Sequence, residues 1–140
     1  MNIGSASAPV SFTLDTVAPG APVLSEQGST KLADNYLNAT EAGTTTTFRV
    51  TLPTSGSLAV AGDRVELLLG GASFGTAKLA TLSGANVSSG YVDFTVAKTD
   101  LGADGAKALT AKITDVAGNI GNASVAANFT LDTGVPNAPS

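Results

Sequence analysis

The start of the chain is repeated near its end at a constant offset of 117 residues. Residues 2–22 align with residues 119–139, and 13 of the 21 aligned positions are identical. The longest shared piece is Phe-Thr-Leu-Asp-Thr, at 12–16 and again at 129–133. A single domain has no folding reason to contain its last strand twice. A segment of a tandem array does, because it holds one complete repeat and the end of the repeat before it.

The repeat also sets the expected domain boundaries. Proline-bearing segments follow both copies of the shared piece, and prolines spaced in this way favour an extended, semi-rigid connection. We therefore expect residues 1–16 to be the last strand and the start of the linker of a preceding repeat. Residues 17–133 would form the complete domain, and residues 134–140 the linker to the next repeat. About 117 residues is an ordinary size for a domain with its own core.

The composition suits a β-protein with a hydroxyl-rich surface. Hydrophobic residues make up 43% of the chain, which is enough for a core, although only five are Phe and two are Tyr. Charged residues make up 13%, about half the usual share. A disordered chain would have lower hydrophobicity and higher charge.

Apolar and polar residues alternate in several short runs, as expected of half-buried strands. Turn-rich stretches containing glycine separate these runs. With an opening strand near Val23–Ser25 and a connector near Gly75–Leu82, the count is about seven strands. The chain is therefore predicted to be all-β, an immunoglobulin-like β-sandwich with Greek-key connections. One helical turn is expected around Asn38–Ala42. The alternating apolar positions are Phe48, Val50 and Leu52; Val65, Leu67 and Leu69; Val92, Phe94 and Val96; Leu109, Ala111 and Ile113; and Val125, Ala127, Phe129 and Leu131.

Several function classes are disfavoured by composition. Without Cys or His the chain has no disulfide, no thiolate nucleophile, no Cys/His zinc site and no imidazole base, so we do not expect an enzyme. The net charge of −4 and the scattered Lys and Arg residues make nucleic acid an unfavourable partner. No apolar run has the length of a membrane span, so membrane insertion is not expected.

Asp115 is the first candidate for a functional residue. It continues the inward phase of the run that ends at Ile113, so its carboxylate is expected at the mouth of the sandwich. A turn of the type Asp-x-x-Gly-Asn can satisfy that carboxylate locally through backbone N–H groups. Alternatively, Asp115 is an oxygen ligand for Ca²⁺, which takes six to eight oxygens from carboxylates, amides and carbonyls.

The topology of an immunoglobulin-like sandwich brings further candidates to the same end. The incoming linker with Asp15 and the loop with Asp63 are expected beside Asp115. Three carboxylates without a neighbouring Lys repel one another unless a cation bridges them. Asn119 can add an amide oxygen. The sequence therefore predicts a Ca²⁺ site where the linker enters the domain.

The opposite end is expected to gather a second set of oxygen-bearing residues. Asp34, Asn38 and Glu41 could form a second cation site, but Asx-turns and helix caps use the same residue types. Asp132 leaves the domain at this end. In an array, Asp132 would serve the next domain as Asp15 serves this one.

The chain resembles bacterial immunoglobulin-like repeats from the extender regions of giant surface adhesins, including RTX adhesins and biofilm-associated proteins. The resemblance covers nearly the whole chain, and Asp15, Asp132, Asp115 and Asn119 match its motif positions directly. It implies Ca²⁺ bound near domain junctions, a stiff and extended array, and action outside the cell at the bacterial surface. The segments that carry it are Phe-Thr-Leu-Asp-Thr-x-x-Pro-x-Ala-Pro, Ala61–Gly70, Asp100–Gly105 and Thr114–Asn119.

The resulting functional hypothesis is a structural extender repeat whose partners are adjacent repeats of the same polypeptide. The alternative is a carbohydrate- or protein-binding module that acts through its end loops, although the chain has no Trp and only two Tyr for aromatic contacts. A monomer is expected. Pairing of residues 2–16 with a neighbouring molecule, in place of that molecule's residues 119–133, would instead give strand-swapped chains.

Overall fold

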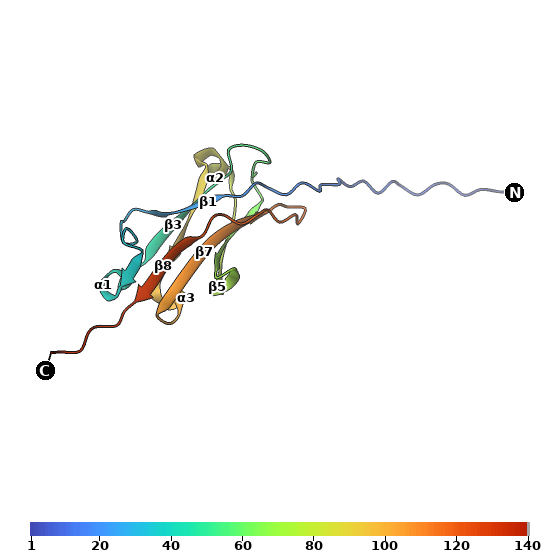
Figure 1. Cartoon of the computed structure of the whole chain (residues 1–140). Coiled ribbons are helices and arrows are strands. Elements are labelled where there is room, and N and C mark those ends of the chain that lie inside the picture. The colour runs from blue at the N-terminus through green and yellow to red at the C-terminus, as the bar shows by residue number, and fades with distance from the viewer. Residues whose placement is uncertain (140) are drawn as a thin grey trace.

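The structure is a computed structural model that describes residues 1–139, and its strands form two sheets (Figure 1). One sheet has the strand order β1–β3–β6, and the other has the order β2–β8–β7–β4–β5. All pairings are antiparallel except that of β2 with β8, which is parallel. The strands are β1 (Val23–Gln27), β2 (Tyr36–Asn38), β3 (Thr46–Thr51), β4 (Arg64–Leu69), β5 (Ala72–Thr81), β6 (Tyr91–Val96), β7 (Gly105–Thr114) and β8 (Ala127–Asp132).

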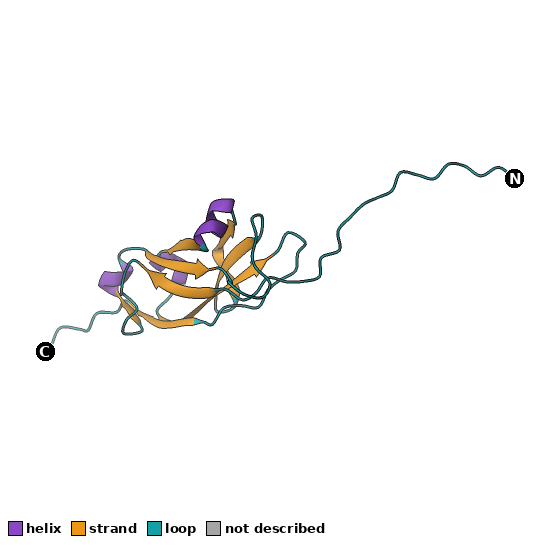
Figure 2. Cartoon of the chain, turned by 90° about the horizontal axis from the view of Figure 1, so that it is seen from above, coloured by secondary structure: helices purple, strands orange, loops and turns teal. Residues whose placement is uncertain are grey.

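Three short helices lie in the connections between strands (Figure 2). They are α1 (Ala39–Ala42), α2 (Gly84–Ser89) and α3 (Lys98–Leu101). The side chains of Asn38 and Ser83 cap the first N–H groups of α1 and α2. The helical turn predicted around Asn38–Ala42 is confirmed as α1, whereas α2 and α3 were not predicted.

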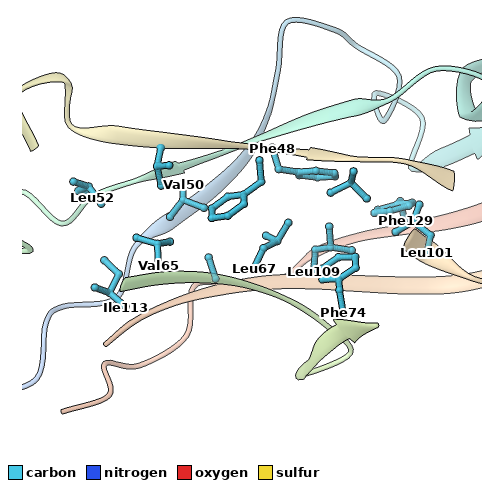
Figure 3. Packing of buried hydrophobic residues seen from close by; sticks show 14 of the residues in the cluster. Phe48, Val50, Leu52, Val65, Leu67, Phe74, Leu101, Leu109, Ile113 and Phe129 are labelled. Carbon is cyan, nitrogen blue, oxygen red and sulfur yellow. The ribbon is translucent and has the colours of Figure 1, made fainter. Parts of the chain in front are cut away.

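The core lies between the two sheets and is built from the inward positions of their strands (Figure 3). The side chains of Phe48 from β3 and Phe129 from β8 stack across it, with ring centroids 6.4 Å apart. This contact places β8 in the middle of the packing. The other large core residues are Val50, Leu52, Val65, Leu67, Phe74, Leu82, Phe94, Val96, Leu101, Leu109, Ile113 and Leu131.

The predicted immunoglobulin-like sandwich is confirmed, with two corrections. The structure has eight strands among its described residues, because β2 forms in a segment where no strand was predicted. Val125 is wrong as a core position: its side chain is 90% exposed, and β8 begins two residues later. The neighbouring Ser124 is buried instead, because its N–H donates to the carbonyl of Ala111 and its Oγ accepts from the Ala111 N–H.

The connection from β7 to β8 begins as a tight hairpin. Thr114 and Ile120 form an isolated antiparallel bridge, and the Gly121 N–H donates to the Ile113 carbonyl at 2.8 Å. Residues 119–126 therefore follow β7 closely before β8 starts. This hairpin projects the loop 115–119 beyond the end of the sheet.

Residues 1–14 are extended and exposed (Figure 1). From Asp15 on, the chain contacts the sandwich, since the Asp15 carbonyl accepts the Asn119 side-chain amide. The N–H of Gly20 donates to the Ser57 carbonyl at 2.9 Å. The carbonyl of Pro19 packs so close to Gly121 that a Cβ there would lie 2.4 Å from the Pro19 oxygen. These two contacts fix the path of the incoming segment against the β7–β8 hairpin.

The two termini leave the sandwich at opposite ends (Figures 1 and 2). We call the end where residues 15–22 arrive the entrance end, and the end where β8 finishes the exit end. The sandwich therefore adds its own length to the path of the chain rather than folding the chain back. Of the helices that residues 1–139 form, none has the length and apolarity needed to cross a membrane.

Candidate functional site

The entrance end holds a pocket of about 210 Å³ whose lining includes all three aspartates that were predicted to lie at this end. Asp15 comes from the incoming segment, Asp63 from the loop before β4, and Asp115 from the loop after β7. None of the described residues that line the pocket is Lys or Arg. The remaining lining is mainly apolar: Val17, Pro19, Ser57, Leu58, Val60, Val116 and Ala117.

Asp63 is the buried member of this group. Its side chain is 1% exposed, and its Oδ2 accepts the Val60 N–H at 2.9 Å. Its Oδ1 is buried and has no hydrogen-bond partner among the described residues. A buried carboxylate oxygen without a partner is costly, so Asp63 is the group at this end that most needs a further ligand.

Asp115 is held by the loop that follows it. Its Oδ1 accepts the Asn119 N–H at 2.8 Å, and its Oδ2 accepts the Asn119 side-chain amide at 2.8 Å. These hydrogen bonds lower the pKa of Asp115, with smaller contributions from the N–H groups of Gly118 and Ala117. The loop that follows Asp115 therefore favours the ionised form of its carboxylate and fixes the orientation of that carboxylate.

Asn119 also ties the incoming segment to the domain. Its amide nitrogen donates to the backbone carbonyl of Asp15 at 2.9 Å as well as to Asp115. The Asp15 carboxylate accepts the Val17 N–H at 3.0 Å. Asn119 was predicted to contribute an amide oxygen, and in the structure it contributes the amide N–H groups that join linker and loop.

At the exit end, the residues of the predicted second site have local partners. The Asp34 carboxylate accepts the Tyr36 N–H at 2.9 Å, which makes an Asx-turn. Asn38 and Glu41 form a capping box on α1, with the two reciprocal hydrogen bonds both at 3.0 Å. Asn38 lies opposite Asp132 in the parallel register of β2 and β8. The sequence analysis named these Asx-turn and helix-cap roles as the alternative to a second cation site.

Asp104 is an exit-end residue that the site prediction omitted. Its carboxylate accepts the backbone N–H of Thr133 at 2.7 Å and the Thr133 hydroxyl at 2.8 Å, and these bonds lower its pKa. Asp132 accepts the Gly134 N–H at 3.2 Å. Asp104 lies in the segment Asp100–Gly105 that carries the family resemblance, but no residue pattern showed that its carboxylate would hold the end of β8.

Lys31 was also missed, because a single Lys in a loop has no distinctive pattern. Its ammonium donates to the carbonyls of Glu41 and Thr45 at 3.1 and 2.9 Å, and to the Thr44 hydroxyl at 2.5 Å. It thus binds one carbonyl in the last turn of α1 and one beyond that helix, and neutralises part of the negative charge at the exit end.

The acidic residues of the entrance end are of a type that hard cations take as ligands. Three aspartates line the pocket, and carboxylate oxygens are the ligand type that Ca²⁺ prefers. Among residues 1–139, no group of three acidic side chains is close enough in this structure to hold a metal ion by itself. A bound cation would therefore also need backbone carbonyls, water, or residues of a neighbouring repeat.

Solved structures of bacterial adhesins resemble this chain. A structure described as a Ca²⁺-stabilised adhesin that helps an Antarctic bacterium reach out and bind ice matches with 26% identity and a TM-score of 0.52, over 87% of this chain and 26% of that one. One from a study of host cell surface retention of a 1.5-MDa bacterial ice-binding adhesin has 26% identity, a TM-score of 0.49, and coverage of 87% and 35%. An immunoglobulin-like domain of the M. primoryensis ice-binding adhesin has 25% identity, a TM-score of 0.47, and coverage of 84% and 100%.

The chain thus spans about a third or less of the first two matched chains. No family model and no curated protein matches the sequence. The match to the Ca²⁺-stabilised adhesin extends over most of the sandwich and combines a shared fold with sequence similarity. The resemblance to immunoglobulin-like repeats of bacterial adhesins, predicted from the sequence, is therefore confirmed.

Proposed function

We propose that the chain is a structural extender repeat of a bacterial cell-surface adhesin, and that Ca²⁺ stiffens the junction at its entrance end. The observation that carries the proposal is the entrance-end pocket lined by Asp15, Asp63 and Asp115, together with the buried Asp63 Oδ1, which has no hydrogen-bond partner in the part of the chain that the structure describes. In this proposal residues 17–133 are the repeat, residues 1–16 end the preceding repeat, and residues 134–140 begin the next linker.

The path of the chain supports a role as a spacer that extends the array. Because the chain enters and leaves at opposite ends of the sandwich, repeats in series would add their lengths (Figure 1). Prolines in both linkers keep the connections extended. An array of such modules would project whatever lies at its tip away from the cell.

Calcium would act at the junction through charge. Asp15 lies on the linker, whereas Asp63 and Asp115 belong to loops of the domain. Without a cation, repulsion between linker and loops favours a mobile junction. With Ca²⁺ bound, the carboxylates of both parts are attached to one ion and the linker direction is fixed. Extracellular modules bind Ca²⁺ with Kd values of roughly 10⁻⁴–10⁻³ M, so occupancy would be high outside a cell and low in its cytoplasm.

The same site would stabilise the fold, since a ligand that binds only the folded state adds free energy by mass action. At a tenfold excess of Ca²⁺ over Kd, one site contributes about 1.4 kcal/mol. That corresponds to a rise in Tm of roughly 5 °C for a domain of this size. A fold without disulfides would benefit from such a contribution.

Thermal unfolding tests the proposal. The Tm is measured with millimolar Ca²⁺, with Mg²⁺ and with EGTA. We expect a rise that only Ca²⁺ produces and that Asp115→Asn removes, because this substitution keeps the size of the side chain but not its charge. In Asp93→Asn the Ca²⁺ response should persist, because that carboxylate pairs with Arg49 on the outer face of β3 and β6. An identical Tm with Ca²⁺ and EGTA would remove calcium from the mechanism.

Asp34→Asn separates the second candidate site from the first. Asparagine can make the same Asx-turn with Tyr36, so the fold should be preserved. If the exit end also binds Ca²⁺, this variant would lose part of the calcium-dependent rise while Asp115→Asn loses another part. If the entrance end is the only site, the response of Asp34→Asn equals that of the parent chain.

A further inference from the structure

The two copies of the repeated segment lie in opposite surroundings. Phe129 and Leu131 are 4% and 0% exposed in β8. Phe12 and Leu14, their counterparts at the offset of 117, are 84% and 81% exposed in the segment that precedes the domain. Residues 2–16 therefore present the apolar pattern of a core strand directly to solvent.

Four residues of 119–133 that make specific contacts in the sandwich are the same amino acid at the corresponding position of 2–16. Gly121, which has no room for a Cβ against Pro19, corresponds to Gly4. Ser124, whose Oγ accepts the Ala111 N–H, corresponds to Ser7. Asn119 and Thr133, which bind Asp115 and Asp104, correspond to Asn2 and Thr16.

The differences fall where the domain tolerates them. Val125 is exposed, so its replacement by Ala8 loses little packing. Pro9 stands for Ala126, which lies just before β8, so the proline removes no N–H from the β7–β8 ladder. Val10 replaces the half-buried Ala127 with a stronger strand former. Residues 2–16 thus keep what β8 needs to pair with β7 and fill the core.

A molecule cannot place residues 2–16 in its own β8 position, because the chain is too short. In that position Thr16 would lie at the exit end, while β1 starts at Val23 near the entrance end. The β7–β8 ladder between these ends is about 30 Å long at ~3.3 Å per residue. The seven steps from Thr16 to Val23 reach at most about 25 Å.

In an array residues 2–16 would complete the preceding repeat. We propose that in this chain they are a donor strand for a second copy, in which they take the place of residues 119–133. The partner is thus another molecule of the same sequence, joined through β7 and β2 rather than through an outer surface. In the unsubstituted chain, β8 belongs to the same molecule as the β7 edge with which it pairs. Its effective concentration there is therefore higher than that of a donor strand from another molecule. Exchange is therefore favoured when β8 is weakened, or when chains refold together at high concentration. It does not require Ca²⁺.

Weakening β8 without touching the donor strand tests this inference. Phe129→Ala removes the ring that stacks on Phe48 but leaves Phe12 intact. After unfolding and refolding at rising concentration, light scattering should show species of twice the 13.7-kDa monomer mass or more. The matched variant Phe12→Ala should stay monomeric, and the double variant Phe12→Ala/Phe129→Ala should lose the association. Association that does not depend on Phe12, or a folded Phe129→Ala that stays monomeric, would overturn the inference.

Disulfide trapping decides the question even if Phe129→Ala does not fold. The chain has no Cys, so any cross-link comes from introduced residues. Ala108 pairs with Asn128 in the β7–β8 register, and Ser11 is the counterpart of Asn128. Opposed antiparallel residues lie about 4.5–5.5 Å apart at Cα, which is within disulfide range.

In the variant Ser11→Cys/Ala108→Cys, refolding at high concentration under oxidising conditions should therefore give disulfide-linked dimers. The control Ser5→Cys/Ala108→Cys should give only background, because Ser5 corresponds to Asn122, outside β8. Equal dimer yields in the two variants would contradict strand exchange.

Discussion

Residues 2–16 and residues 119–133 share most of their side chains, yet only the second segment contains a strand. The first is extended and exposed over its whole length, whereas the second follows β7, fills the core with Phe129 and Leu131, and ends at the Asp104 carboxylate. The comparison separates the intrinsic strand propensity of the sequence from the stabilisation that strand pairing and core packing add.

The difference shows that β8 forms because β7, β2 and the core are there to pair and pack with it. Strand propensity reflects packing on a half-buried surface more than a preference of the backbone itself. Burying a Phe or Leu side chain contributes about 1.5–3 kcal/mol, and residues 119–133 gain that contribution twice. Residues 2–16 gain none of it within their own chain. Substitutions made in matched pairs, one in each segment, measure this difference directly.

The largest difference is expected for the pair Leu131→Ala and Leu14→Ala. Leu131 is fully buried, so its truncation should lower the free energy of unfolding by about 2–5 kcal/mol. Leu14 is exposed, and its truncation should change the value by less than about 0.5 kcal/mol. Urea unfolding at low protein concentration, where strand exchange does not contribute, measures both. Equal losses would mean that residues 2–16 are packed in solution.

The pair Gly121→Ala and Gly4→Ala should give the next largest difference. A Cβ at residue 121 would lie 2.4 Å from the Pro19 carbonyl oxygen and 3.2 Å from that of Ile113, so the incoming segment has to shift. We expect a loss of about 2 kcal/mol. A Cβ at residue 4 meets nothing within 4 Å, and Gly4→Ala should be neutral. Because the clash lies at the entrance end, a simultaneous loss of any Ca²⁺ response in Gly121→Ala would link linker path and ion binding. A neutral Gly121→Ala would mean that Pro19 does not hold the position described.

A smaller difference is expected for Ser124→Ala and Ser7→Ala. Removal of the Ser124 hydroxyl leaves the Ala111 N–H without its acceptor, at a cost of about 1 kcal/mol. Ser7 is exposed and its replacement should have no measurable effect. Hydrogen exchange gives a local check, because the Ala111 amide should lose protection in Ser124→Ala but not in Ser7→Ala. Unchanged protection would show that another group accepts this N–H.

Ser124 also explains where sequence reasoning about the fold succeeded and where it failed. The alternation in β3, β6 and β7 predicted their buried faces correctly, because each strand pairs on a regular register. Before β8 the phase changes, since Ser124 turns inward to bind β7 and Val125 turns out. The three residues of β2 were missed because the parallel partner that makes them a strand lies more than ninety positions away.

For the candidate site, sequence reasoning predicted which aspartates lie at the entrance end but not the hydrogen bonds that they make. The sandwich topology was enough to bring Asp15, Asp63 and Asp115 to one pocket. It could not show that Asn119 would donate to both Asp115 and the Asp15 carbonyl, because such bonds depend on the shape of one turn. Nor could it show that Asp63 would be fully buried with one oxygen unpaired. These details depend on distances of a few ångströms that no residue pattern specifies.

The smallest effect expected is a pH dependence at the end of β8. Thr133 donates two hydrogen bonds to Asp104, and these lower the pKa of that carboxyl below its ordinary value of about 3.9. A carboxyl whose pKa is depressed in the folded state stabilises the fold above its unfolded pKa, and the contribution is lost as the pH falls through the folded pKa. The contribution of Asp104 should therefore be complete at pH 7 and decline below about pH 4.

Asp104→Asn isolates this contribution, because the amide still offers an oxygen to Thr133 but does not titrate. The difference in Tm between the parent chain and Asp104→Asn should be present at pH 7 and shrink between about pH 4 and pH 2. Thr16 is the counterpart of Thr133, and no hydrogen bond among the described residues joins it to a carboxylate, so Thr16→Val should leave the acid profile unchanged. Thr133→Val removes the hydroxyl but keeps the backbone N–H, which is the larger cause of the lowered pKa, so it should flatten the acid profile only in part. If Thr16→Val flattened the profile as much as Thr133→Val, the contact with Asp104 would not be what distinguishes the end of β8 from its exposed counterpart.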